Sequence, residues 1–208
     1  MIKTYQRRSP LANLGLVGNI SNDPALKESI YMTEILHLAK INLRGDASKN
    51  AFCDNVKKIL KIELPKTPNT IEGLGSRFQA LWLGPDEWLL TSSKDSEHHL
   101  YSNLREQLKT YHVAITDVTE SRTTIQLEGT NACQVIMKDC SLDLHPKAFK
   151  IGQCAQTIVA KTNIIMCRVL DSKSKHPIFQ IHVTNSYAQH LWEWLEDAAN
   201  EYRSAIVC

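Results

Sequence analysis

Apolar segments alternate with polar turns along this chain, and the clearest example is the stretch 80–91. Two apolar arms, carrying Trp82 and Trp88, flank the sequence Gly-Pro-Asp at 84–86. Proline presets φ for the second position of a tight turn, and aspartate can hydrogen-bond its own backbone. The pattern therefore predicts a β-hairpin over residues 78–91, with the two tryptophans as cross-strand neighbours.

The order of apolar and polar segments occurs twice. The segment INLRGDASKNAF at 41–52 resembles IQLEGTNACQVI at 125–136. Later matches keep the same order, at Pro65 and Pro146 and in a helical stretch near the end of each half. Self-similarity in a constant order indicates two copies of one structural unit.

Each copy predicts the same series of elements. A strand ends at a glycine, and a helix follows, capped by Asp46 in the first copy and by Thr130 or Asn131 in the second. A proline-containing loop, a two-stranded hairpin and an amphipathic helix complete the unit. The second hairpin is predicted to have strands at 164–170 and 178–184. The closing helices are predicted at 98–111 and 187–202.

We predict an α+β fold in which two pseudo-symmetric β-α-β-β-α repeats form one domain. A single such unit cannot cover both faces of its sheet, so two units packed around a pseudo-twofold axis are expected. Repeat one spans about 35–111, repeat two spans about 118–202, and a strand at 113–118 links them. Residues 28–208 form this domain, and residues 1–27 form an arm that lies across a surface of this chain or of a partner.

Composition excludes several classes of protein. The 24 basic and 22 acidic residues nearly balance, which is untypical of proteins that bind nucleic acid. No apolar run reaches the ~20 residues that span a bilayer, so no membrane contact is expected, and the N-terminus lacks a secretory signal core. These features predict a cytoplasmic protein whose six cysteines are reduced, since none of them forms a C-x-x-C pair.

Few residues are candidates for chemistry, and none is predicted to be catalytic. The spacing of Cys133, Cys140 and His145 matches no common zinc site, so no metal is expected. The segment DVTESR places Asp117 near Arg122, which makes both weak candidates for a binding site, with Arg122 as the anchor for a carboxylate or phosphate. The alternative for this segment is a hydrogen-bonded bend with a local ion pair.

Two tryptophans lie close together on the predicted last helix. Trp192 and Trp194 are two positions apart, and side chains with this spacing point to different sides of a helix. We therefore expect that they do not both face the core, and Trp192 is a candidate interface aromatic.

Several strings in this sequence resemble the gamma subunit of heterotetrameric sarcosine oxidase. They are LWLGPDEWLL at 81–90, DVTESR at 117–122, IQLEGTNA at 125–132 and DCSLDLHP at 139–146, and the similarity covers about residues 38–200. The N-methylglutamate dehydrogenase complex uses a similar subunit, and these strings do not separate the two complexes.

The resemblance implies a place in a complex that oxidatively demethylates sarcosine to glycine, with alpha, beta and delta subunits as partners. It implies FAD, FMN and NAD on the alpha and beta subunits, zinc on the delta subunit and tetrahydrofolate as an acceptor of the one-carbon unit, with no cofactor bound by this chain alone. It also implies the fold of the folate-binding domain of the glycine-cleavage aminomethyltransferase. That enzyme has a catalytic carboxylate on the strand similar to about 160–170, where this chain has Asn163 and no Asp or Glu.

Two functional hypotheses follow. The first is a non-catalytic subunit that acts in assembly and stability, with the polar hairpin tip, Pro85, Asp86 and Glu87, facing a partner subunit. The second is a stand-alone folate or one-carbon binding protein, in which Arg122 contacts the glutamate tail and a tryptophan of the hairpin contacts the pterin.

Overall fold

The computed structural model describes residues 8–14, 29–36, 38–92, 97–170 and 176–204. In the first half of the chain, extended apolar segments pair into one antiparallel five-stranded sheet, in the order β3-β4-β5-β2-β6. Its strands are β2 (Ala39–Arg44), β3 (Ile71–Glu72), β4 (Phe78–Gly84), β5 (Glu87–Ser92) and β6 (Ala114–Asp117).

The second half forms another antiparallel five-stranded sheet, in the order β8-β9-β10-β7-β1. The two orders correspond position by position, so that β3 matches β8, β5 matches β10 and the edge strand β6 matches β1. Its strands are β1 (Tyr31–Glu34), β7 (Arg122–Glu128), β8 (Gln153–Val159), β9 (Thr162–Val169) and β10 (Ile178–Thr184).

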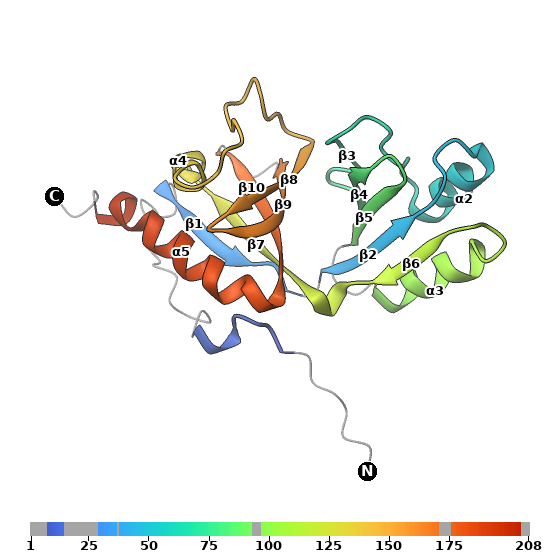
Figure 1. Cartoon of the computed structure of the whole chain (residues 1–208), viewed down its shortest axis with the longest axis horizontal. Coiled ribbons are helices and arrows are strands. Elements are labelled where there is room, and N and C mark those ends of the chain that lie inside the picture. The colour runs from blue at the N-terminus through green and yellow to red at the C-terminus, as the bar shows by residue number, and fades with distance from the viewer. Residues whose placement is uncertain (1–7, 15–28, 37, 93–96, 171–175, 205–208) are drawn as a thin grey trace, which may run out of the picture.

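Helices cover the outer face of each sheet, and the inner faces pack against each other (Figure 1). Strand β5 shows why: Trp88 and Leu90 join the cluster with the helices, whereas Leu89 joins the cluster between the sheets. Alternate residues of a strand point to opposite faces, so a strand buried on both faces is apolar throughout. The helices are α2 (Asn50–Leu60) and α3 (Glu97–Gln107) on the first sheet, and α4 (Ala132–Met137) and α5 (Asn185–Ser204) on the second.

Each sheet takes one of its two edge strands from the other half of the chain. Strands β1 and β2 follow each other in sequence but lie in different sheets, and the same holds for β6 and β7. Where the two connections cross, Ile35 N donates to Thr124 O at 2.8 Å, and Val118 N donates to Lys40 O at 2.9 Å. These equivalent bonds join the two halves at the centre of the molecule.

The α+β class and the main strand pairs agree with the sequence prediction. Pro85 and Asp86 form the turn of the first hairpin, and Trp82 pairs with Trp88 across it. The second hairpin is the pair β9–β10, and the linking strand is β6. Each half contains one strand more than the predicted unit before its hairpin, β3 or β8, and the short strand β1 was not predicted.

The predicted helix cap at Asp46 is wrong. Helix α2 begins at Asn50 after the N-cap residue Lys49, and no side chain caps it. Asp46 Oδ1 instead accepts hydrogen bonds from N and Oγ of Ser48, at 2.9 and 2.6 Å, and so forms a turn before the helix. In the second half, Asn131 occupies the N-cap position of α4, also without a side-chain cap bond.

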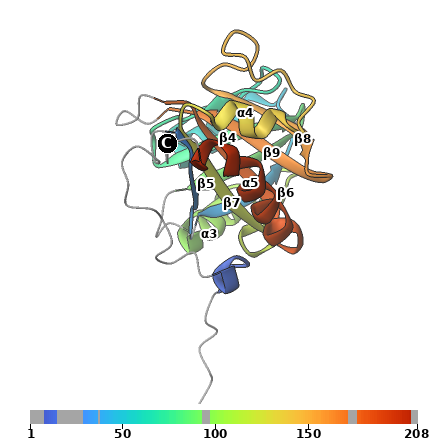
Figure 2. The same ribbon diagram turned by 90° about the vertical axis from the view of Figure 1, so that its left-hand side faces the viewer.

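The described part of the predicted arm packs on this chain's own second half. Leu11 is fully buried in the cluster that also holds Trp192, and the short 3-10 helix η1 (Ala12–Leu14) lies below α5 in both views (Figures 1 and 2). The expectation that Trp192 and Trp194 do not both face the core is wrong, because Trp192 is only 5% exposed and Trp194 packs against the same cluster. The rest of the arm lies outside the described residues.

Candidate functional site

Asp117 and Arg122 lie where the two halves cross, at either end of the 3-10 helix η2 (Thr119–Ser121). Asp117 Oδ1 accepts a hydrogen bond from Thr119 N at 3.0 Å, so this carboxylate holds a bend just before η2. The Arg122 guanidinium has no hydrogen bond or ion pair with the residues that the structure describes. The hydrogen-bonded bend is therefore present, and the predicted local ion pair does not form in this part of the chain.

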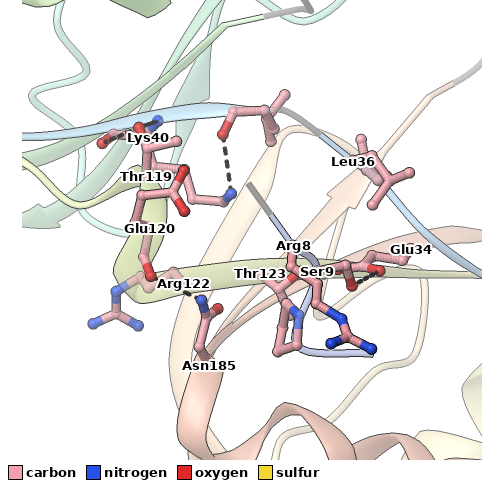
Figure 3. A pocket seen from close by; sticks show the side chains of 13 residues that line it. Arg8, Ser9, Glu34, Leu36, Lys40, Thr119, Glu120, Arg122, Thr123 and Asn185 are labelled. Carbon is pink, nitrogen blue, oxygen red and sulfur yellow. Dashed lines mark hydrogen bonds between the residues drawn. The ribbon is translucent and has the colours of Figure 1, made fainter. Parts of the chain in front are cut away.

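The crossing connections enclose a small polar cavity of about 60 Å³ (Figure 3). Lys40 lines it from β2 although it is buried, and Lys40 Nζ donates to Leu38 O at 3.0 Å. The arm closes one side, where Ser9 Oγ donates to the Glu34 carboxylate, which also accepts a hydrogen bond from Thr123 Oγ1 at 2.5 Å. A cavity of this size holds a few water molecules and is too small for a pterin ring.

The core beside this crossing holds a titratable group that sequence analysis missed. His182 is 2% exposed, and its Nδ1 lies 2.8 Å from Thr124 Oγ1. Burial, with a further contribution from the positive charges of Lys40 and Arg122, lowers the pKa of His182 to about 3. The imidazole is therefore neutral at pH 7. Thr91 occupies the corresponding position of β5, so a residue-by-residue comparison of the repeats is the signal that finds His182.

Arg122 also borders a hollow of about 690 Å³ where β8 turns into β9. Asn163, which takes the place of the expected carboxylate, lines the same hollow and is exposed. Thr157 and Thr184 add hydroxyl groups, and Arg122 is the one charged residue among the described lining residues. An anion here would meet one cation and neutral hydrogen-bonding groups, and no lining carboxylate faces it to transfer a proton.

The tip of the first hairpin is held against its own sheet. Asp86 O accepts a hydrogen bond from Gly45 N at 3.0 Å, and the Glu87 carboxylate pairs with Arg44 Nη2 at 2.9 Å. Pro85 and Asp86 are exposed, whereas Glu87 is half-buried. The three interface candidates therefore separate into two residues that face solvent and one that is engaged within the sheet.

Pro85 and Asp86 border an open cleft of about 1090 Å³ at the end of the first sheet. The buried Phe52 contributes to its lining, and the other sides come from residues 44–49 and 110–114. Sequence analysis missed this cleft because it combines three segments that lie far apart along the chain. The fold places them together at the ends of β2, β5 and α3.

The two hairpin tryptophans differ in their access to a ligand. Trp88 is fully buried, lies 6.2 Å from the Phe52 ring and donates from Nε1 to Pro65 O at 2.8 Å. It cannot stack on a pterin in this fold. Trp82 is half-buried, so part of its surface remains accessible.

Metal binding and thiol chemistry find little support in the described residues. No three His, Cys, Asp or Glu side chains in these ranges gather closely enough to hold a metal ion. Burial raises the pKa of the Cys154 thiol to about 11 and also raises the pKa of Cys133, which makes both poor nucleophiles. In the same ranges, no helix is both long and apolar enough to cross a bilayer.

Residues 44–201 match the family model described as the sarcosine oxidase, gamma subunit family. The chain belongs to this family. One relative is the sarcosine oxidase subunit gamma of Corynebacterium sp. strain U-96, 27% identical over 204 residues. Another is the sarcosine oxidase subunit gamma of an Arthrobacter sp., 28% identical over 207 residues. Both alignments cover 98% of this chain and 95% of the relative, so the similarity to gamma subunits runs from end to end.

Solved structures agree with membership of the gamma subunit family. The chain is similar to one in the heterotetrameric sarcosine oxidase from Corynebacterium sp. U-96 in complex with pyrrole 2-carboxylate, with a TM-score of 0.80, 25% identity and coverage of 95% and 96% of the two chains. It is also similar to the glycine cleavage system aminomethyltransferase T from Bartonella henselae, with a TM-score of 0.57, 13% identity and coverage of 82% of this chain and 48% of that one. The second likeness concerns the fold alone and confirms the predicted aminomethyltransferase-like fold.

Proposed function

We propose that this chain is the gamma subunit of a heterotetrameric sarcosine oxidase, and that it acts in assembly and stability and not in catalysis. The proposal depends most on the end-to-end match to a chain of such a complex, with a TM-score of 0.80 over 95% of this chain. A similar backbone over nearly the whole length offers partner subunits a surface of similar shape.

The chemistry of the candidate residues supports a non-catalytic role. Asp117 is engaged with the backbone of Thr119, His182 is buried and neutral, and Arg122 faces a hollow whose other described lining residues are uncharged. None of these arrangements supplies a nucleophile with an adjacent base, or an acid and a base facing one substrate position. In this proposal the alpha, beta and delta subunits carry FAD, FMN, NAD and zinc and use tetrahydrofolate. Residues 1–27 are an arm, and residues 28–208 are the domain.

Co-expression with the alpha, beta and delta chains tests the proposal. An affinity tag on this chain should retain all three partners in equal amounts, and the complex should oxidise sarcosine. Omitting this chain should lower the yield and thermal stability of the complex, while the KM for sarcosine of the remaining enzyme stays the same. A tagged chain that remains alone beside its three partners contradicts the proposal.

Two further assays separate the alternative functions. Faster turnover of N-methylglutamate than of sarcosine by the assembled complex would assign the chain to the related dehydrogenase. Calorimetric titration of the isolated chain with tetrahydrofolate should release no binding heat. Saturable heat would favour a stand-alone folate-binding protein.

A further inference from the structure

The strand-to-helix turns of the two repeats are equivalent in position. Gly45 follows β2 and Gly129 follows β7, and each backbone N–H donates to a carbonyl of its own hairpin tip, at 3.0 and 3.3 Å. Residues 29–30 precede β1 and residues 112–113 precede β6. Each of these edge strands begins opposite the last residue of the strand it pairs with, β7 or β2. The same three segments therefore meet at the end of each repeat.

In repeat two, the segment before the edge strand closes the turn. Ser29 O accepts a hydrogen bond from Asn131 N at 3.0 Å, and Ser29 Oγ accepts one from Asn131 Nδ2 at 3.0 Å. The same hydroxyl donates to Tyr202 O at 3.0 Å, and the following residue, Ile30, is buried. A Cβ added to Gly129 would lie 2.5 Å from Ser29 O. Polypeptide backbone thus fills the space beside this turn.

In repeat one, the segment before the edge strand does not close the turn. Ala47 stands two residues after its glycine, as Asn131 does, and Ala47 N donates to no group in the described ranges. The three atoms nearest to a Cβ added at Gly45 all belong to the Phe52 ring, the first at 2.7 Å. Residues 112–113 line the cleft of about 1090 Å³ but make no backbone hydrogen bond to the turn.

We propose that this cleft receives an extended segment of another subunit, with a main-chain carbonyl that accepts a hydrogen bond from Ala47 N as Ser29 O does from Asn131 N. The inference rests on the proposed function, because it needs a partner chain. Repeat two supplies the template for the occupant: a small polar residue followed by a buried apolar one. Main-chain pairing of this kind gives affinity, and side-chain pockets give specificity.

The charges around the cleft fit a neutral peptide segment better than an anion. Arg44 and Lys49 are balanced by Asp46 and Asp86, so the lining carries no excess of either sign. The apolar surface comes from Phe52 and from the half-buried Tyr111 and Val113. An apolar side chain of the incoming segment can pack on this surface, beside Val113, which is the counterpart of Ile30 in repeat two.

Filling the cleft is the direct test. Ala51→Trp places a bulky group in the cleft from an exposed position of α2, and Lys58→Trp places the same group on the same helix away from the cleft. In co-expression with the alpha, beta and delta chains, Ala51→Trp should lower retention of the partners at least tenfold, while Lys58→Trp retains them like the wild type. Both isolated variants should unfold at the wild-type temperature, which separates lost docking from lost folding.

The outcomes distinguish this inference from the proposed function. If the wild type assembles and Ala51→Trp assembles equally well, the cleft inference is overturned and the proposed function stands. If the wild type itself retains no partner, both fail. Photo-crosslinking from p-benzoylphenylalanine at position 47 then identifies the occupant: a crosslink to another subunit supports the inference, and crosslinks only between copies of this chain overturn it.

Discussion

Repeat one and repeat two share their strand order, their pair of outer helices and the hydrogen bond from the turn glycine to the hairpin tip. They differ in what closes their ends and fills their cores. Repeat two is closed by Ser29, covered by the arm at Leu11 and contains the buried His182. Repeat one has an open cleft and a core built around Trp88. The comparison teaches that backbone hydrogen bonds define the shared unit, whereas the side chains and flanking segments give each copy its own surface.

Removing the central aromatic residue of either core should have the largest effect. Trp88 and Phe179 each follow the first residue of their strand, β5 or β10, and both are fully buried. Trp88→Ala and Phe179→Ala should each lower the free energy of unfolding by about 3–5 kcal/mol. Urea unfolding followed by circular dichroism should show one transition for both variants. Two separate transitions would mean that the repeats unfold independently.

The turn glycines should respond unequally to alanine. At Gly129, with a φ of +133° and the Ser29 backbone 2.5 Å from the added Cβ, Gly129→Ala should cost about 2–3 kcal/mol of stability. At Gly45 the three nearest atoms to the added Cβ belong to the Phe52 ring, and this side chain must shift, so Gly45→Ala should cost about 1–2 kcal/mol. Chemical denaturation measures both values, and equal costs would contradict the claim that only one of these turns is closed by backbone.

His182 should make repeat two sensitive to acid. Its pKa is lowered from 6.5 to about 3 in the folded chain. Between these pH values, His182 binds a proton in the unfolded chain and does not in the folded chain. Stability is therefore fully present above pH 6.5 and is lost as the pH falls toward 3. Between pH 6.5 and 5 this loss amounts to about 1.5 kcal/mol.

The variant His182→Thr copies the residue that repeat one has at Thr91. It should remove this part of the pH dependence, as measured by urea unfolding at pH 7.5, 6.5 and 5. His112→Thr, at an exposed position, is the matched control for the same substitution at another histidine. A His182→Thr variant with the wild-type slope would show that His182 is not the acid-sensitive group.

The smallest effect is expected for the residues before the edge strands. Ser29→Ala removes two hydrogen bonds from a half-buried hydroxyl and should cost about 1 kcal/mol. His112→Ala, at the corresponding position in the open cleft, should change the stability of the isolated chain by less than about 0.5 kcal/mol. Thermal unfolding of the two isolated variants gives the comparison, and a larger loss for His112→Ala would reverse it.

Local patterns predicted the parts of the fold that local physics determines. The turn at Pro85 and Asp86 needs only its own residues, and the pairing of Trp82 with Trp88 follows from it. Strand β1 escaped prediction because it is four residues long and pairs with a strand nearly a hundred positions away. The two tryptophans of α5 both face the core, and local spacing could not reveal this because their cluster includes Leu11 from the distant arm.

The candidate site was harder to predict than the fold. The predicted pairing of Arg122 with Asp117 does not form, and Asp117 Oδ1 instead accepts a hydrogen bond from the backbone N–H of Thr119. The shared hollow of Arg122 and Asn163 and the cleft beside Ala47 arise only when distant segments meet. The spacing of neighbouring residues does not predict contacts between distant segments. The internal repeat helps, because it predicts which segments of the two copies correspond in position.

The exchange of edge strands has a consequence for how this chain can be made and divided. During synthesis, β2 is made long before its partner β6, and the interval between β1 and its partner β7 is longer still. The growing first half therefore exposes strand edges that only later segments can cover. A gene cut between α3 and β6 would give two fragments, each lacking a strand that the other carries. Such fragments are expected to fold as a complementary pair and not as independent modules.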